Sequence, residues 1–209
     1  MHERFLNPNW LKIWIRPRAV IRSILDGGSY RHIHKLAMAA GIGRTPFVTA
    51  QGNLGDKFPV GSILVFCFVV GPLFGLFALY AWSAFVTWTG RWFGGTGTQG
   101  QVRVANAWAA IPQIYGAFLW LEAIACLGDE TFQKHMPRLE DANWPLLLLF
   151  LIVFATHIVW MVFVELKALA EVHRFSFWKA LLAAITARIL LVLAMASPFL
   201  IIYGVIMLL

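Results

Sequence analysis

Long apolar runs separated by short polar loops are the dominant pattern of this sequence. Four of the runs are long enough to cross a bilayer, which takes about 20 predominantly apolar residues in a helix. A fifth, weaker segment around residues 30–50 carries Lys35 and Arg44 and is interrupted by glycine. The pattern predicts an all-α, polytopic membrane protein. The four strong runs cover roughly residues 59–89, 102–127, 144–167 and 177–208.

The segment that precedes the spans is amphipathic rather than uniformly apolar. At helical spacing, one face carries Trp10, Ile13, Trp14, Pro17, Val20, Ile21 and Ile24. Basic side chains flank this face, a combination typical of a helix in the membrane interface, as a plain anchor or as a sensor of lipid or a partner. Pro17 is expected to kink or restart the helix. We therefore predict an interfacial amphipathic segment at residues 1–28 and a membrane domain at residues 29–209.

Composition and loop charge predict how the chain is inserted. Hydrophobic residues make up 60% of the 209 residues and charged residues 13%, about half the share in soluble domains. Loops 90–103 and 168–176 are basic or balanced, whereas loop 128–143 carries four acids against two bases. Cytoplasmic loops are enriched in Lys and Arg, so the first two are expected inside and the third outside. Eight of the 17 Lys and Arg precede residue 45, which places the N-terminus inside and requires five transmembrane helices, with a periplasmic C-terminus.

Five stretches, in order along the chain, carry a family resemblance. They read WLKIWIRPRAVIRSILD, GPLFGLFALY, TWTGRWFGGTGT, MPRLED and ELKALAEVHRFSFWKAL. Together they resemble the bacterial branch of the Yip-domain family, the Ypt-interacting proteins. The resemblance implies a five-span helical bundle in the bacterial inner membrane.

The same resemblance implies less about activity. The family's eukaryotic members are similar to membrane-trafficking adaptors that bind prenylated Rab-type GTPases through a long N-terminal region with a D-L-Y-G-P-like motif. This sequence shows neither that region nor that motif, so the GTPase partnership does not carry over. What remains as an expectation is a non-enzymatic membrane organiser or adaptor.

The stretch GTGTQG at residues 95–100 has the glycine spacing of a dinucleotide-binding loop. It lies between two membrane spans rather than between a strand and an amphipathic helix, so we predict no nucleotide there. We expect Gly94, Gly95 and Gly97 to supply the positive φ angles of a tight turn. Thr98 is placed to cap the helix that follows.

Gly71 and Gly75 form a second glycine pattern, a small-xxx-small pair within the first strong span. Such a pair lets two membrane helices approach closely. Pro72 lies between them and is expected to bend the span. The predicted role is therefore helix packing.

Basic residues on the predicted cytoplasmic side indicate membrane lipid, preferentially anionic, as the partner. The free amides at the start of the helix after the glycine turn offer a place for a lipid phosphate beside neighbouring arginines. The sequence has no nucleic-acid motif, so we attribute its basic charge to the positive residues that face the cytoplasm in a membrane protein. The candidate lipid contacts are Arg16, Arg18, Arg22, Arg91 and Arg103.

Ionisable residues inside predicted spans are sharper signals, because a charge at the bilayer centre costs several kcal/mol. Four occur: Glu122, His157, Glu165 and Arg188. An antiparallel hairpin of the last two spans would bring Arg188 within reach of Glu165, as a pair that fixes helix register. His157 suits either a hydrogen bond to a neighbouring helix or a proton relay or substrate contact. These residues define the alternative function, a small-molecule or ion transporter with a polar site between spans three, four and five.

Other chemistry finds little support in the sequence. We expect no metal site and no cofactor, since His32 and His34 lack a third ligand and no catalytic motif occurs at a suitable position. We also expect no enzymatic activity. Lipids, a second copy of the chain or other membrane proteins are the partners that the sequence leaves open.

Overall fold

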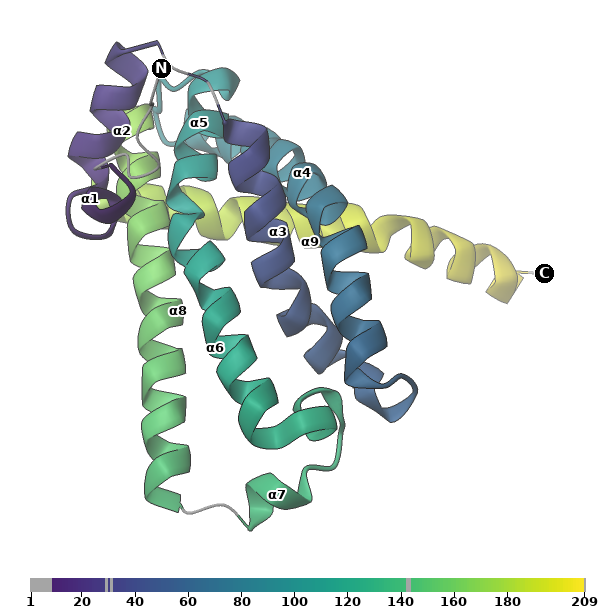
Figure 1. Ribbon diagram of the computed structural model, residues 1–209. Helices are drawn as coiled ribbons and strands as arrows, with labels where there is room; N and C mark the ends of the chain where they lie inside the picture. Colours follow the sequence, from purple (N-terminus) through teal and green to yellow (C-terminus); the bar gives the residue numbers. More distant parts are fainter. Residues whose placement is uncertain (1–8, 29, 31, 142–143, 209) are drawn as a thin grey trace.

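The protein is all-helical in the computed structural model, which describes residues 9–28, 30, 32–141 and 144–208. No strand occurs within these ranges. Figure 1 shows α3, α4, α6 and α8 along one common direction, with α1, α2 and α5 gathered at one end. The elements are α1 (Asn9–Ile15), α2 (Pro17–Asp26), α3 (Ile33–Gln51), η1 (Leu54–Asp56), α4 (Val60–Trp92), α5 (Gln99–Ala109), α6 (Ile111–Leu127), η2 (Gly128–Phe132), α7 (Pro137–Glu140), α8 (Trp144–His173) and α9 (Phe177–Leu208).

Pro17 divides the amphipathic segment into two helices, as its position predicted. α1 ends at Ile15 and α2 begins at Pro17, whose missing amide hydrogen has no cost in the first turn of a helix. The apolar face packs on protein, because Ile13 and Ile21 are fully buried in one cluster with side chains of α5 and α8. An interfacial position for the outer surface of these helices stays a prediction. Residues 1–8 of the predicted segment 1–28 lie outside the described ranges.

Four helical segments in the described part of the chain are long and apolar enough to cross a membrane. α4, α8 and α9 coincide with predicted runs, whereas the third segment differs because it is divided. α5 ends at Ala109 and α6 begins at Ile111, since the ring of Pro112 cannot donate a hydrogen bond to the preceding turn. The weak fifth segment forms α3, which is not among the four.

α3 and α4 are packed backbone to backbone through glycine. A Cβ added at Gly41 would overlap the carbonyl oxygen of Gly71, and one added at Gly75 would overlap the carbonyl oxygen of Ala37. Gly71 and Gly75 therefore lie at a helix–helix seam, where small residues permit close approach. Figure 1 shows α3 beside α4, running from the end that holds α5 to the end that holds η1.

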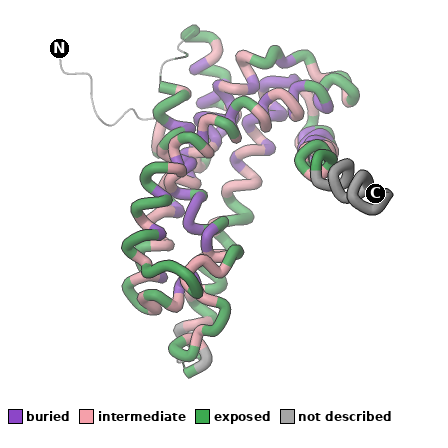
Figure 2. The backbone as a smooth tube through the Cα atoms, turned by 90° about the vertical axis from the view of Figure 1, so that its right-hand side faces the viewer, coloured by how far each residue is buried: buried purple, intermediate pink, exposed green. Residues whose placement is uncertain are grey.

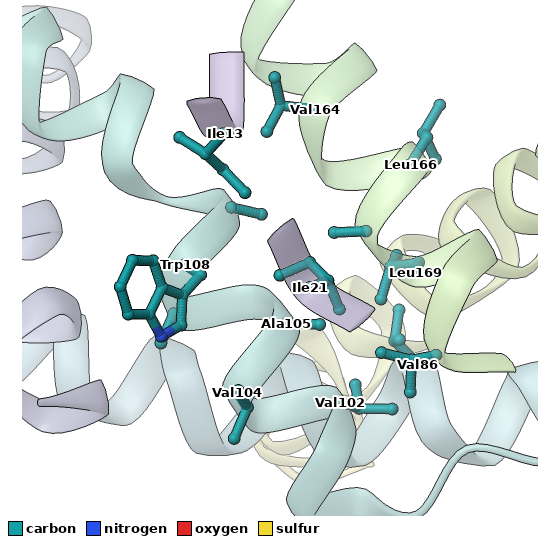
Figure 3. Close-up of a cluster of buried hydrophobic side chains, with 14 of the residues drawn as sticks. Ile13, Ile21, Val86, Val102, Val104, Ala105, Trp108, Val164, Leu166 and Leu169 are labelled. Carbon is teal, nitrogen blue, oxygen red and sulfur yellow. The ribbon is translucent and has the colours of Figure 1, made fainter. Parts of the chain in front are cut away.

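Buried residues concentrate toward one end of the molecule (Figure 2). We call this region the packed end, where side chains of α1, α2, α4, α5 and α8 interlock (Figure 3). Its fully or almost fully buried side chains include Ile13, Ile21, Val86, Val102, Ala105 and Leu169. Burial of apolar surface here joins the N-terminal helices and the membrane helices into one core.

The opposite end is held together by polar contacts between two distant loops. The carboxylate of Asp129 accepts a hydrogen bond from the amide of Val60 at 3.0 Å, which places a negative charge at the start of α4. Asp56 accepts one from the amide of Lys134 at 3.1 Å. A small second apolar cluster lies beside these contacts, formed by Ile63, Cys67 and Phe132.

α9 leaves α8 at a steep angle, and its far half projects beyond the other helices (Figure 1). The corner between them is short, and Arg174 within it has a positive φ of 56°. α9 packs chiefly on α4, where Thr89 Oγ1 donates a hydrogen bond to the carbonyl of Ala183 at 2.9 Å. The antiparallel hairpin expected for the last two spans is therefore wrong.

Candidate functional site

The glycine-rich turn after α4 packs around a buried histidine. Of the three glycines expected to have positive φ, Gly94 alone has it, at 81°. A Cβ added at Gly90 would lie 2.6 Å from His173 Cε1, and one added at Gly95 would lie 2.5 Å from His173 Nδ1. Gly97 meets the same ring at 3.1 Å. A Cβ at Gly97 would lie closer still to Val172 Cγ1, at 2.6 Å, so close approach to His173 and Val172, rather than positive φ, explains Gly95 and Gly97.

The His173 ring packs against the buried side of this turn. No pattern in the sequence indicated this contact. The residue is 1% exposed, and its ring stacks on Phe175 with centroids 5.0 Å apart. Its carbonyl accepts a hydrogen bond from the amide of Thr96 at 3.3 Å. Beyond the glycines, Thr98 caps α5 through reciprocal bonds with Gln101, as its position predicted. The turn is thus held by its contacts with His173 and, at its C-terminal end, by the Thr98 cap of α5.

A polar pocket of about 780 Å³ lies beside this turn, and we call it the arginine pocket. Arg18, Arg22 and Arg174 line it together with the acids Asp26 and Glu171. Arg22 Nε donates a hydrogen bond to Glu171 Oε1 at 2.7 Å, and this bond raises the pKa of the Arg22 guanidinium. Arg18 Nε is buried without a hydrogen-bond partner among the described residues. Three arginines against two carboxylates give the pocket a net positive charge.

The other predicted lipid contacts lie outside this pocket. Arg16 and Arg91 are exposed, and the Arg103 guanidinium lies 5.1 Å from the centre of the Tyr80 ring. The structure thus brings two of the five predicted arginines together and adds Arg174, which we had not selected. The sequence signal for Arg174, a basic residue in a short loop between spans, had been used only to assign topology.

A second feature is a cavity of about 580 Å³ lined by residues of α3, α4, α5, α6, α8 and α9, which we call the central cavity. Most of its wall is apolar, and the aromatic side chains include Phe47, Phe74, Trp120 and Phe154. Its polar side chains are Arg44, Asn106, Gln113, His157, Glu165 and Arg188.

Three of the four predicted intramembrane residues line this cavity. Arg188 Nη2 donates a hydrogen bond to Glu165 Oε2 at 2.9 Å, which is the pair expected from the sequence. His157 Nε2 is buried without a hydrogen-bond partner within the described ranges and lies against Gly116. Glu122 is exposed on α6 and does not line the cavity. The structure therefore joins three of these residues and separates the fourth.

Arg44 is the cavity residue that sequence reasoning missed. It lies on α3, and we had taken its charge as evidence against a span. The rule that selected Glu165 and Arg188, an ionisable residue in an apolar segment, applies to Arg44 as well. Only the placement of α3 beside the other helices shows that this charge belongs to the same cavity.

The side chains of both pockets have the chemistry of anion binding. Both pockets contain guanidinium groups, which recognise carboxylate and phosphate oxygens through paired donors. Across the described ranges, no group of three or more His, Cys, Asp and Glu side chains is placed to hold a metal ion. The geometry therefore favours recognition of an anion.

Comparison with known proteins gives one match. A family model described as the Yip1 domain matches residues 11–207. The matched range contains all residues of the arginine pocket and of the central cavity. No curated protein and no solved structure matches the chain.

Proposed function

Because the chain belongs to the Yip1 domain family, we propose that it is a non-enzymatic, multi-pass membrane organiser or adaptor whose basic end binds anionic lipid. The observation that supports this proposal is the arginine pocket. Arg18 and Arg22 come from α2 and Arg174 from the corner between α8 and α9, so segments distant in sequence contribute to one cationic site. Each Arg or Lys near an anionic membrane surface contributes about 1 kcal/mol to binding.

We further propose that the chain crosses a bacterial inner membrane five times, with the packed end in the cytoplasm. The position of α3 supports a fifth crossing, because α3 runs beside α4 from the packed end toward η1 and η2 (Figure 1). The acidic loop 128–143 at the opposite end suits the periplasm. Single cysteines introduced at Ser23 and Lys57, after replacement of both native cysteines, should react with an impermeant maleimide from opposite sides. Labelling of both from one side would contradict the proposal.

Lipid retention tests the proposed function directly. The protein is reconstituted in nanodiscs of phosphatidylcholine and phosphatidylglycerol, and the retained lipids are identified by native mass spectrometry. We expect the wild type to retain phosphatidylglycerol preferentially. Replacing Arg18 and Arg174 with Gln should lower this preference by about fivefold for each arginine. Replacing Arg16, Arg18, Arg22, Arg91 and Arg103 together should abolish it.

A matched control removes charge of the same sign from the other end of the molecule. Lys57 and Lys134 lie near the acidic loops, and replacing both with Gln should leave the preference unchanged. Equal retention of neutral and anionic lipid by the wild type would refute the proposed function. An equal loss in the control variant would show that net charge, and not the arginine pocket, carries the effect.

A transporter is the second candidate, and the central cavity is the observation that favours it. His157 and the Glu165–Arg188 pair line that cavity, as such a site requires. The separation of Glu122 from the cavity and the pairing of Glu165 with Arg188 weigh toward the organiser. Uptake of a substrate by sealed proteoliposomes that is lost on changing His157 to Ala would support transport instead.

A further inference from the structure

The central cavity has one positive charge in excess. Its lining contains three side chains of the types Lys, Arg, Asp and Glu, namely Arg44, Glu165 and Arg188. Glu165 and Arg188 neutralise each other through their 2.9 Å hydrogen bond. Arg44 forms no hydrogen bond or ion pair with any other residue in the described part of the chain. Arg44 lies within electrostatic reach of both, so one carboxylate faces two guanidinium groups, and Arg44 is the one of the two without a hydrogen bond to it.

The surroundings of Arg44 are mostly apolar, although part of its side chain is exposed at the surface of the molecule. Aromatic and aliphatic side chains form most of the cavity wall, and Arg44 is on a helix packed between membrane-length helices. An unpaired arginine at such a place is costly unless it meets water or an anion. Trp82, which also lines the cavity, has a buried Nε1–H with no acceptor among the described residues. An indole N–H can only donate, so both groups require an electron-rich partner.

The rim of the cavity indicates where that partner comes from. Several side chains that line the cavity are also exposed at the surface, and they are large and apolar. In a membrane protein such side chains face the lipid chains. They are Phe47, Phe77, Ile158, Val192 and Met195. A ligand that enters past them passes from the bilayer and not from water.

We propose that the central cavity binds one anionic amphiphile, with its oxyanion head group on Arg44 and its hydrocarbon chain along the aromatic wall. A ligand with a single negative charge would balance the net charge of the cavity. Its oxygen atoms would accept hydrogen bonds from Arg44 and Trp82, which can only donate. The volume of about 580 Å³ lies within the range of about 300–1,000 Å³ typical of small-molecule pockets. The site therefore suits a single-chain amphiphile, or the head group and one chain of a larger lipid.

Carboxylate and phosphate share the chemistry that Arg44 recognises, and the experiment separates them. The purified full-length protein is titrated in neutral detergent with oleate, with lysophosphatidic acid, with zwitterionic lysophosphatidylcholine and with inorganic phosphate. Bound ligand is counted by native mass spectrometry. We expect one molecule of oleate or lysophosphatidic acid per chain, weaker binding of lysophosphatidylcholine and none of inorganic phosphate.

Variants then assign the binding to Arg44. Arg44→Gln should weaken binding of the anionic amphiphile by roughly 10- to 100-fold, because a charge-assisted hydrogen bond is lost. Arg44→Lys should retain most of it. Lys35→Gln removes the same charge from an exposed position on the same helix, outside the cavity, and should have no effect. Arg18→Gln, in the arginine pocket, should also leave cavity binding unchanged, so failure of this proposal and failure of the lipid-organiser proposal are distinguishable.

Two results would overturn the inference. One is equal binding of oleate and lysophosphatidylcholine by the wild type, which needs no variant and so does not depend on whether Arg44→Gln folds. The other is unchanged oleate binding by a folded Arg44→Gln protein, with folding checked by circular dichroism and size-exclusion chromatography.

Discussion

The packed end and the central cavity are built from the same helices, yet their interiors differ completely. On α4, Val86 is buried in the packed end, while Ala78 lines the cavity. On α8, Leu169 belongs to the packed end and His157 to the cavity. Small and β-branched residues let the helices meet at one end. Farther along, the break between α5 and α6 and the steep departure of α9 leave space between them.

The polar groups of the two regions also differ. At the packed end, Thr89 Oγ1 donates to the carbonyl of Ala183 on α9 at 2.9 Å, and Asn106, which also lines the cavity, donates through Nδ2 to Ser83 Oγ at 2.9 Å. Unpartnered polar atoms occur there too, since Trp108 Nε1 and both nitrogens of the His173 ring have no hydrogen-bond partner within the described ranges. Around the cavity, Arg44 and the indole of Trp82 are left without partners in the same ranges. What distinguishes the cavity is that the charged side chains of Arg44, Glu165 and Arg188 line open space, whereas the core of the packed end is formed by closely packed apolar side chains.

The same substitution made in both regions is the strongest test of this contrast. Ala105→Leu adds volume where the wild type has no free space, and it should lower the free energy of unfolding by up to about 3 kcal/mol. Ala78→Leu, on the cavity wall, should change it by less than about 1 kcal/mol, because the added atoms extend into the cavity. Titration with dodecyl sulfate in mixed micelles, followed by circular dichroism, measures both. Equal costs would contradict the division into a packed and an open region.

A smaller effect on stability is expected for Gly90→Ala, where the glycine turn meets His173, and its sign should depend on whether the His173 ring is present. The three atoms nearest to a Cβ at Gly90 all belong to the His173 ring. Gly90→Ala should therefore destabilise the wild type by about 1 kcal/mol or slightly more. In a His173→Ala background the same change should stabilise by up to about 1 kcal/mol, since alanine favours the helix.

Gly100→Ala provides the matched control for the glycine turn. Its Cβ meets nothing within 4 Å, so the change should not destabilise either background. If Gly90→Ala had the same effect with and without the His173 ring, close packing would not explain this glycine.

The smallest expected effect concerns the hydrogen bond between α4 and α9. Thr89→Val removes the donor to the Ala183 carbonyl and should cost about 0.6 kcal/mol, the average for such bonds between membrane helices. Thr186→Val is the control, because Thr186 bonds only the Leu182 carbonyl of its own helix. Thermal unfolding of both variants in detergent gives the comparison. A larger loss for Thr186→Val would show that the contact between α4 and α9 contributes little.

Much of the fold could be predicted because it depends on local physics. Length and apolar content determine a membrane-spanning helix, so α4, α8 and α9 were found close to their observed bounds. Pro17 and Thr98 act within one turn of their own position, so they marked helix starts correctly. The break between α5 and α6 was missed, although Pro112 was visible in the sequence.

The candidate sites could be predicted only in part, because they depend on which helices meet. An ionisable residue in an apolar run is visible in the sequence, which is how His157, Glu165 and Arg188 were selected. Whether Glu122 or Arg44 joins them depends on helix rotation and on the position of α3, and neither is encoded in the local pattern. Arg174 was missed for the same reason.

By itself, the sequence determined that this is an all-helical membrane protein, where α4, α8 and α9 lie along the chain, and which family it resembles. These properties follow from hydrophobic length, charge asymmetry and the backbone limits of proline and glycine, all of which act locally. Only the tertiary structure decided that the amphipathic face of α1 and α2 is buried in protein, that the glycine turn closes on His173, and that Arg44 lines a cavity with Glu165 and Arg188. Those properties arise from contacts between segments far apart in the chain, which burial of apolar surface brings together in three dimensions.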